Sequence, residues 1–517
     1  MEMRQLKRFL AVCLAVALGT SCLAGCGGTG NNGKEGSSTE IEIAYWHSGL
    51  GTDWLDNMIA AFEDKYPEYH VKVKSSADFN AVKAPFGNET TDTIDLYMAN
   101  AEYNHEYSEP LNDVLESIAE GESKTIREKL DPAYLEMEIA ADGNFYELTY
   151  GGGAFGIVYN KKLFEQAGVR NIPRTTNELV NVCDSLYAAG IVPHCHFKNA
   201  SYWYYISDVW RMQYDGKDYF VNNFYKCTDE NGKSPSKEVF TKKDGRYEVL
   251  KVLEKVITQN YTLSGSNTHE MTTMQTKFLQ GECAMMVTGS WIANEMKSTG
   301  EMDDFTVMKT PVISSVIDKL TTVTSDAELR TVISAVDAVA DGEKKLSEYQ
   351  DGENYKIDDL SVSAADWDYI YKARNTVSTN YAGETMFIPT YSNAKEGAKK
   401  FIRFMYSDEG YRIYTDTLHM PLPMTMDSGE LDTSKWSDFE KAELHLIETT
   451  VQSATSSIKS QHPIFYLGGA EAYAKEALFD KFCAKNPADR LTATQAWEKL
   501  MEKVDQYYDN WLINMGE

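Results

Sequence analysis

The sequence predicts an α/β protein built from two or more lobes. Short runs of β-branched and aromatic residues alternate along the chain with amphipathic stretches at helical spacing, which is typical of mainly parallel sheets covered by helices. The chain has 517 residues, of which 43% are hydrophobic. A single hydrophobic core stops growing near about 250–300 residues. Breaks at 151–153, Pro311 and Pro421 interrupt the pattern and indicate where the chain changes direction.

The first residues predict an exported protein. Arg4, Lys7 and Arg8 precede an apolar run over 9–18, which is the layout of a secretory leader. Leu-Ala-Gly-Cys at 23–26 is similar to the lipobox of bacterial lipoproteins, whose cysteine is acylated before cleavage just ahead of it. We therefore expect removal of residues 1–25, acylation of Cys26 (including palmitate), and anchoring at the extracytoplasmic face of the cell membrane.

An uncleaved transmembrane anchor is the alternative explanation of this apolar run. A spanning helix needs about 20 predominantly apolar residues, and Gly19-Thr20-Ser21 interrupts residues 9–24. Residues 27–39 are almost all Gly, Asn, Ser, Thr, Lys or Glu and cannot build a core. We expect 26–40 to be a lipidated flexible tether, since two acyl chains give lasting attachment to a bilayer.

Charge and cysteine content limit the partners and the covalent structure. With 50 Lys and Arg against 78 Asp and Glu, the formal net charge is −28. Nucleic acids and anionic headgroups repel such a surface, so we expect no nucleic-acid partner, and a neutral or cationic ligand remains possible. The mature chain keeps an odd number of cysteines without C-x-x-C spacing, which predicts buried thiols: Cys183, Cys195, Cys227, Cys283 and Cys483.

The first half of the mature chain predicts strands that alternate with helices. Leu55, Met58 and Phe62 lie at helical spacing after a possible cap at Thr52 or Asp53. The expected strands are 41–46, 71–74, 93–98 and 157–160, and the expected helices lie around 55–62, 126–135 and 179–186.

The second half continues the alternation with longer acidic segments. Apolar stripes are core by default, so the methionines at helical spacing near 271–274 indicate packing and not a metal site. The expected helices lie around 271–278, 329–339, 367–373, 398–405 and 493–511, and the expected strands are 284–287 and 305–311. The three glycines at 151–153 are a candidate hinge.

Four segments resemble the extracellular solute-binding proteins of bacterial ABC importers, in the carbohydrate-binding family 1 that includes maltose-binding protein. Their order and spacing are more specific than any single segment. The segments are Ile43-Ala-Tyr-Trp-His-Ser-Gly49, Ile157 to Gly168 running into Pro173 to Leu179, Phe278 to Trp291, and Ala398 to Gly410 running on to Pro421.

The resemblance implies a type II periplasmic-binding-protein fold, in which crossing segments join two α/β lobes that close over a ligand. Crossings are expected near 149–154, 309–313 and 419–424. The first lobe would then hold 41–150 with 313–418, and the second 151–312 with 419–517. The stretch 314–380 is longer than the family pattern. The resemblance also implies a monomeric binding receptor that needs no cofactor, with a carbohydrate ligand and ABC permease subunits as partners.

A carbohydrate site needs flat aromatic side chains for the C–H faces and polar side chains for the hydroxyls. The resemblance places stacking aromatics at Trp291, in the run 203–205 and at Tyr466. The other candidates follow the ends of the first and third strands, although core packing or solvation would explain most of them as well. The expected ligand-binding residues are Trp46, His47, Asn100, Glu102, Trp203, Tyr204, Trp291 and Tyr466.

Metal and catalytic functions find little support in the motifs. In His194-Cys195-His196, adjacent residues of an extended segment point to opposite sides, so we expect no metal site. The glycine of Asp229-Glu-Asn-Gly232 comes too early for a calcium loop. We find no G-x-S-x-G, H-E-x-x-H or phosphate-binding loop and expect no catalytic residues. The alternatives are a glycoside hydrolase with two carboxylates, or a binding protein for a peptide, polyamine or other cation.

Overall fold

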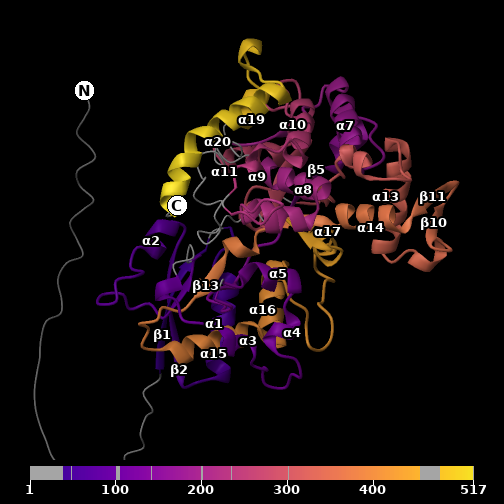
Figure 1. Ribbon diagram of the computed structural model, residues 1–517. Coiled ribbons are helices and arrows are strands. Elements are labelled where there is room, and N and C mark those ends of the chain that lie inside the picture. Colours follow the sequence, from indigo (N-terminus) through magenta and orange to yellow (C-terminus); the bar gives the residue numbers. More distant parts are fainter. Residues whose placement is uncertain are drawn as a thin grey trace, which may run out of the picture. The chain divides into compact units, whose positions relative to one another are not determined.

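The structure is a computed structural model that describes residues 39–47, 49–100, 105–140, 142–198, 202–234, 236–300, 302–454 and 478–515. These residues form two α/β lobes, each with its own sheet and hydrophobic core (Figure 1). The predicted leader, Cys26 and most of the tether lie outside the described residues. Among the described helices, none has the length and apolar character to cross a bilayer.

The first lobe is built on a five-stranded mixed sheet in the order β2-β1-β3-β13-β4. β1 pairs in parallel with β2 and β3, whereas β13 is antiparallel to β3 and β4. Alternate residues Ile41, Ile43 and Tyr45 are fully buried, as the period-two pattern predicts. The strands are β1 (Thr39–Trp46), β2 (Tyr69–Ser76), β3 (Leu96–Met98), β4 (Leu148–Thr149) and β13 (Thr385–Phe387).

Helices from both ends of the sequence cover this sheet. Figure 1 shows α1 and α15 beside β1 and β2, and α1 also packs on α16. The expected helix around 126–135 is two helices, because Pro132 lacks an N–H and begins a new helix capped by the Asp131 carboxylate. The helices are α1 (Asp53–Lys65), α2 (Phe79–Lys83), α3 (Asn112–Leu115), α4 (Ile126–Lys129), α5 (Pro132–Glu138), α15 (Lys395–Met405) and α16 (Asp408–Leu418).

The second lobe holds a six-stranded sheet in the order β14-β12-β5-β7-β6, with β8 also paired to β5. The central strand, β5, is buried over its whole length, as expected for a sheet that helices cover on both faces. Its strands are β5 (Ala154–Asn160), β6 (His194–Cys195), β7 (Met285–Gly289), β8 (Phe305–Met308), β12 (Thr376–Thr379) and β14 (Gln452–Ser453).

Helices from the middle and the end of the chain surround this second sheet. The Thr175 hydroxyl accepts from the Glu178 N–H and so caps the start of α7. The helices are α6 (Lys161–Gln166), α7 (Thr176–Ala188), α8 (Trp203–Asp215), α9 (Glu238–Thr241), α10 (Gly245–Val256), α11 (Met271–Leu279), α12 (Ile292–Glu295), α17 (Asp438–Glu448), α19 (Leu478–Phe482) and α20 (Ala493–Met515).

Residues 313–379 pack on the second lobe, whereas we expected them in the first. Val332 and Trp367 share a core with Ile157, and the Gln213 amide bonds both the Ala373 carbonyl and the Ile313 N–H at 2.9 Å. The segment contains α13 (Asp326–Ala340), α14 (Ala364–Arg374) and a small antiparallel sheet of β9 (Gln350–Asp351), β10 (Asn354–Ile357) and β11 (Leu360–Ser363).

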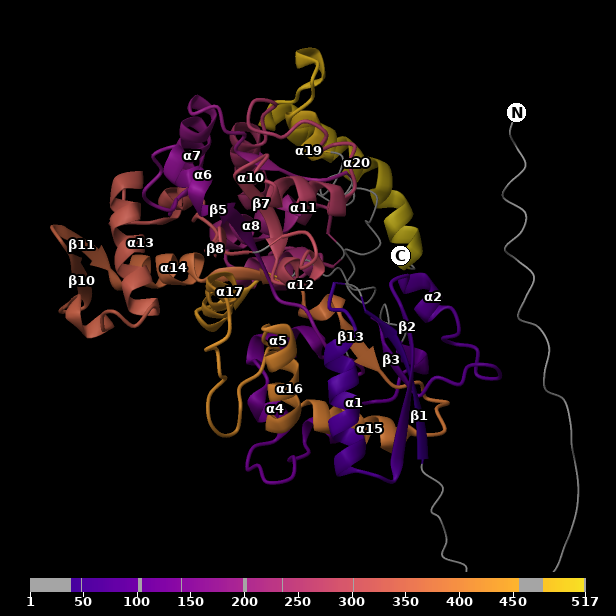
Figure 2. The same ribbon diagram turned by 180° about the vertical axis from the view of Figure 1, so that it is seen from behind.

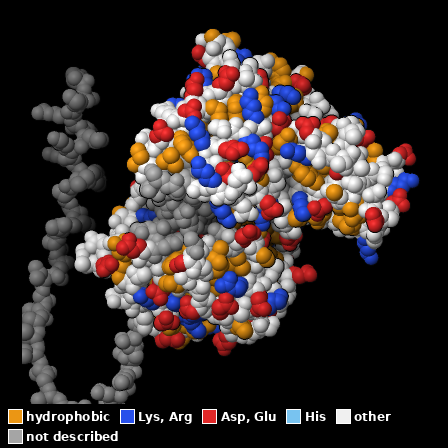
Figure 3. All heavy atoms as spheres, viewed as in Figure 1, with side chains coloured by type: hydrophobic (Ala, Val, Ile, Leu, Met, Phe, Trp, Pro, Cys, Tyr) orange, Lys and Arg blue, Asp and Glu red, His pale blue; other side chains and the backbone are white. Residues whose placement is uncertain are grey.

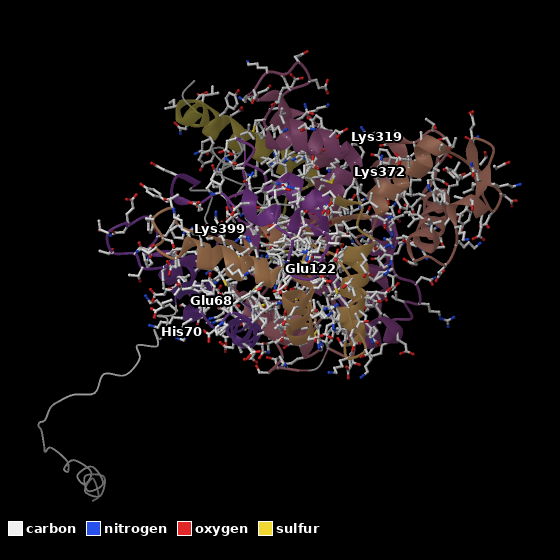
Figure 4. All side chains as sticks on the ribbon, turned by 90° about the horizontal axis from the view of Figure 1, so that it is seen from below. Glu68, His70, Glu122, Lys319, Lys372 and Lys399 are labelled. Atoms are coloured by element: carbon white, nitrogen blue, oxygen red, sulfur yellow. The ribbon has the colours of Figure 1, made fainter. Side chains whose placement is uncertain are left out.

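The figures place this segment in the same way. Figure 2 shows α13 and α14 beside second-lobe helices and away from α1 and α15. In Figure 4, Lys319 and Lys372 of the segment lie apart from the first-lobe residues Glu68 and His70. The chain therefore stays in the second lobe after β8 and does not cross at 309–313. Val312, which is buried, instead forms an isolated parallel β-bridge with Thr175, the residue just before α7.

Two antiparallel segments connect the lobes. β4 leads into β5 through 150–153, and β12 leads into β13 through 380–384. Their ends pair at Thr149 with Thr385 in the first sheet, and at Ala154 with Thr379 in the second. A third connection follows Met424, which still belongs to the first core, and ends before Phe439, which belongs to the second lobe.

Candidate ligand-binding site

Four aromatic rings meet where the first crossing enters the second lobe. The rings of Phe155 and Tyr205 stack with centroids 3.5 Å apart. Trp291 packs edge-on against Phe155 at 4.9 Å and against Tyr202 at 6.1 Å. We call Phe155, Tyr202, Tyr205 and Trp291 the aromatic cluster.

Local backbone geometry places these rings. Trp291 follows β7 and precedes α12, and a Cβ on Gly289 would lie 2.2 Å from its ring. Glycine at 289 therefore lets the indole lie over the strand end. Tyr202 has a φ of 42° just before α8, a left-handed conformation that turns the chain into that helix.

The loop after β1 brings the first lobe to this cluster. A Cβ on Gly49 would lie 3.4 Å from the Glu295 Cβ and 3.6 Å from the Trp291 Cβ. Behind the loop, the Tyr45 hydroxyl donates to the Gly51 carbonyl at 2.7 Å and accepts from the Trp54 indole at 2.8 Å. The first-lobe side is thus also aromatic and hydrogen-bonded in place.

Two carboxyl groups lie near the aromatic cluster. Burial raises the pKa of Glu295, although the Gln275 amide donates to it at 2.8 Å and partly offsets the effect. Glu384, on the second crossing segment, is 6% exposed. Burial raises the pKa of the Tyr202 phenol, and the charges of Tyr205, Glu295 and Glu384 raise it further. The site therefore combines flat rings with acceptors for hydroxyl or ammonium groups.

The predicted site residues fall into different surroundings. Trp291 belongs to the aromatic cluster, and His47 lies in the loop that reaches α12. Trp46 is half-buried, donates to the Ala77 carbonyl at 3.1 Å and packs on Phe79. The Tyr204 ring packs against that of Tyr205 at a tilt of 36°, with centroids 4.1 Å apart.

The other predicted residues lie away from the cluster or outside the described chain. Trp203 is fully buried in the second-lobe core between His194 and Trp210, an environment that favours a packing role. Asn100 is half-buried after β3. Glu102 and Tyr466 lie outside the described residues. Ligand contact by any of these side chains stays a prediction.

Sequence reasoning missed most of the residues that the fold gathers here. Tyr205 belongs to the predicted aromatic run 203–205. Phe155 was missed, although it lies two residues after the glycine break. Glu295 lies one helical turn after Trp291. No local feature of the sequence pointed to Glu384, because the crossing that carries it was expected elsewhere in the chain.

The His-Cys-His motif is used for packing and hydrogen bonds. The His194 Nε2 lies 2.9 Å from the Val256 carbonyl oxygen, and the His196 Nε2 lies 2.7 Å from the Asn267 Oδ1. Within the described chain, no three His, Cys, Asp or Glu side chains gather in a way that could hold a metal ion. The cysteines at 183, 195, 227, 283 and 483 are free thiols and buried.

Two α/β lobes, joined by antiparallel crossings and presenting a polar aromatic site beside them, define the class of two-lobe solute-binding proteins. The profile of the bacterial extracellular solute-binding protein family matches residues 48–412, which is more than half of the chain. The protein belongs to this family. Its members are binding proteins and not enzymes.

Similar proteins agree with this assignment. Binding proteins of Brucella abortus and Brucella suis are 26% identical over 196 residues, covering 37% of this chain and 41% of theirs. The chain thus matches about two fifths of the length of these relatives.

Solved structures match over nearly the whole chain. The bacterial solute receptor AcbH has a TM-score of 0.59 at 13% identity, covering 91% of this chain and 99% of its own. Apo RafE from Streptococcus pneumoniae has a TM-score of 0.58 at 14% identity, covering 92% and 98%. A secreted solute-binding lipoprotein from Streptomyces coelicolor has 0.58 at 15% identity, covering 91% and 99%. At these identities the matches establish the fold.

Proposed function

We propose that the protein is the membrane-anchored receptor of an ABC importer, which captures a mono- or oligosaccharide between its lobes and delivers it to the permease. The observation that carries this proposal is the aromatic cluster beside Glu295 and Glu384 at the crossings. Rings stack on the apolar faces of a sugar, and carboxylates accept hydrogen bonds from its hydroxyl rim.

The ligands of similar structures support a sugar. AcbH is described as preferring β-D-galactopyranose, RafE is solved with raffinose, and another match is a chitin oligosaccharide binding protein. These ligands differ in size and linkage. They therefore support the ligand class and leave the particular sugar open.

Capture follows from differential affinity. A ligand that contacts both the loop at 47–51 and the Trp291 side binds the closed arrangement better than an open one, so it shifts the population toward closure. The permease can then distinguish loaded receptor from empty receptor. Acylated Cys26 and the tether would keep the receptor within reach of its transporter.

The ligand class is tested by thermal shift over a panel of mono- and oligosaccharides, polyamines and peptides, followed by calorimetry on the best solute. We expect a sugar to raise the melting temperature and Trp291→Ala to weaken its binding about 5-fold or more, since one stacked ring contributes about 1 kcal/mol or more. Tyr187→Ala, at a tyrosine that is 51% exposed, is the matched control. Tight binding of another solute without any sugar binding would overturn the carbohydrate assignment.

A cationic solute such as a polyamine is the second candidate. The net charge of −28 and the two carboxyls beside the aromatic cluster favour it. Glu295→Gln separates the two ligand classes. It should abolish most polyamine affinity but reduce sugar affinity only modestly, because an amide still accepts hydrogen bonds.

Membrane anchoring is tested on the full precursor. Cys26→Ser should leave the protein unacylated and move it from the detergent phase to the aqueous phase in a partition assay. Mass spectrometry of the wild type should show a lipid-modified N-terminal cysteine. A wild-type protein with an intact leader would contradict the assignment.

A further inference from the structure

A buried carboxyl group lies beneath the first crossing. Glu443, in the middle of α17, is 2% exposed. Its Oε2 accepts from the Ser290 hydroxyl at 2.8 Å. Its Oε1 is buried and has no hydrogen-bond partner among the described residues. An ionised carboxylate is costly when it is buried and only partly hydrogen-bonded.

Ser290 connects this carboxyl group to the crossing and to the site. Its Oγ accepts from the Ala154 N–H at 3.3 Å, and a Cβ on Gly153 would lie 2.4 Å from the same Oγ. Ser290 also directly precedes Trp291. One side chain therefore supports both the point where the chain enters the second lobe and the start of α12.

The crossing is packed tightly enough to transmit a shift of Ser290. The Asn380 N–H donates to the Gly153 carbonyl at 2.9 Å. Gly152 has a φ of +107°, and a Cβ there would lie 2.9 Å from the Asn380 carbonyl oxygen. The two crossing segments thus touch through their backbones, so a displacement at 153–154 also moves 380–381.

The groups around Glu443 favour its neutral form. Burial raises the pKa of Glu443 to about 8, and the Ser290 hydrogen bond offsets this only in part. From the second crossing, Tyr381 faces it with a buried phenol whose own pKa burial raises, with Glu443 contributing to the shift. Basic groups near α17 are paired elsewhere: His419 with Glu440, His445 with Asp341, and Lys309 with Asn375.

We propose that protonated Glu443 is a positioning residue for ligand capture, which holds Ser290 and thereby the Gly153–Ala154 crossing and Trp291 in the ligand-ready arrangement. The proposal rests on the proposed function, because it assigns a regulation of the same site. When Glu443 loses its proton, the charged carboxylate accepts the Ser290 hydrogen bond more strongly, but the buried charge draws water toward Oε1 or displaces α17. Either change moves Ser290 out of this arrangement, so closure and ligand affinity weaken as the medium becomes alkaline.

The test is a pH profile of affinity between pH 6 and 9.5, measured by calorimetry with the sugar that the thermal-shift panel identifies. The wild type should lose affinity about 10-fold from pH 7 to 9, since the neutral fraction falls about tenfold per unit above the pKa. Glu443→Gln should bind as the wild type does at pH 7 and keep that affinity at pH 9. Glu448→Gln, at an exposed position on the same helix, should follow the wild type.

A second measurement does not depend on a ligand. Amide hydrogen exchange over 150–156 in the free protein should be faster in the wild type than in Glu443→Gln at pH 9, and equal at pH 7. The proposal would be overturned if the wild-type affinity did not change with pH. It would also be overturned if Glu443→Gln showed the same pH dependence of affinity as the wild type. If no solute in the panel binds, the proposed function fails, and the exchange comparison alone decides the role of Glu443.

Discussion

At the scale of single residues, the glycines at 151–153 do more than allow bending. A Cβ on Gly151 would lie 2.4 Å from the Glu384 Oε2 and 2.6 Å from the Leu50 Cδ1. A Cβ on Gly152 or Gly153 would also lie less than 3 Å from a neighbouring atom. The sequence pattern predicted a break here, but the close approach of the second crossing depends on residues more than 200 positions away and leaves no local pattern.

Gly152→Ala should therefore destabilise the protein. The new Cβ meets the Asn380 backbone, and a φ of +107° is unfavourable for alanine. We expect urea denaturation to show a loss of about 1–3 kcal/mol in the free energy of unfolding. Gly300→Ala, where no atom lies within 4 Å of the new Cβ, should change it by less than about 0.5 kcal/mol.

Lys129 is a buried cation in the first lobe. Its ammonium group contacts Glu122, labelled in Figure 4, donates to the Tyr406 carbonyl at 2.7 Å and lies 3.6 Å from Asp408. Its side chain is fully buried, and both acids are less than 10% exposed. The apolar stripes of the sequence gave no indication of this cluster, because a lysine on a short helix is normally solvated.

Lys129→Met should leave two buried carboxylates without their cation. We expect a loss of about 3–5 kcal/mol in unfolding free energy, measured by urea denaturation. Lys72→Met removes a surface pair whose partners are both more than half exposed, and should change stability by less than about 1 kcal/mol. If Glu122→Gln and Asp408→Asn do not restore stability to Lys129→Met, uncompensated charge is not the cause.

At the scale of elements, periodicity predicted the helices and strands that bury one face. The stripe at 55–62 corresponds to α1, 329–339 to α13, and 398–405 to α15. The partner of each element was harder to predict. α13 carries an ordinary amphipathic pattern and α14 only a weak one, and nothing local in them shows that their apolar residues meet the core of Ile157 and not the first lobe.

The attachment of α19 to the second sheet should depend on pH. Burial lowers the pKa of His196, but Asp480 of α19 and Cys483, which directly follows that helix, outweigh this and raise it to about 9, from 6.5. A raised pKa contributes stability below pH 6.5 that is lost as pH rises toward 9. We expect a decline of about 1–2 kcal/mol in unfolding free energy over this window, reduced by screening because Asp480 is 40% exposed.

Urea denaturation at several pH values measures this decline. His196→Gln should make it shallower, whereas His445→Gln, at an imidazole that is 47% exposed, should not. Glu443 also makes the free energy of unfolding fall as the pH rises, over a lower pH range. Its raised pKa means that the folded state binds its proton more tightly than the unfolded state does. Glu443→Gln in the His196→Gln background separates the two effects. An unchanged slope in His196→Gln would contradict the assignment to His196.

At the scale of the whole molecule, the negative charge is dispersed. Figure 3 shows acidic and basic side chains interspersed over the visible face of the described residues. The net charge therefore favours solubility, and the proposed ligand recognition would depend on the contacts at the crossings. Sequence length and composition predicted two or more lobes, but the contact between the two lobes depends on loop geometry.

The contact between the loop at 47–51 and α12 provides a direct test of closure. A Cβ on Gly49 would lie 3.4 Å from that of Glu295, close to the separation of about 3.5–4.5 Å found in disulfides. Gly49→Cys with Glu295→Cys should therefore form a disulfide under mild oxidation that locks the lobes together. Small-angle scattering should then give one radius of gyration with and without ligand, and bound ligand should exchange more slowly.

The two single variants are the controls, because each changes the site without linking the lobes. Both should still contract on ligand binding, and reduction of the double variant should restore the contraction. The native cysteines of the described residues are buried, so the engineered thiols should react before them. Unchanged ligand exchange in a fully oxidised double variant would show that capture does not require separation of the loop at 47–51 from α12. The binding site would then have to be sought within one lobe, where no hinge is needed.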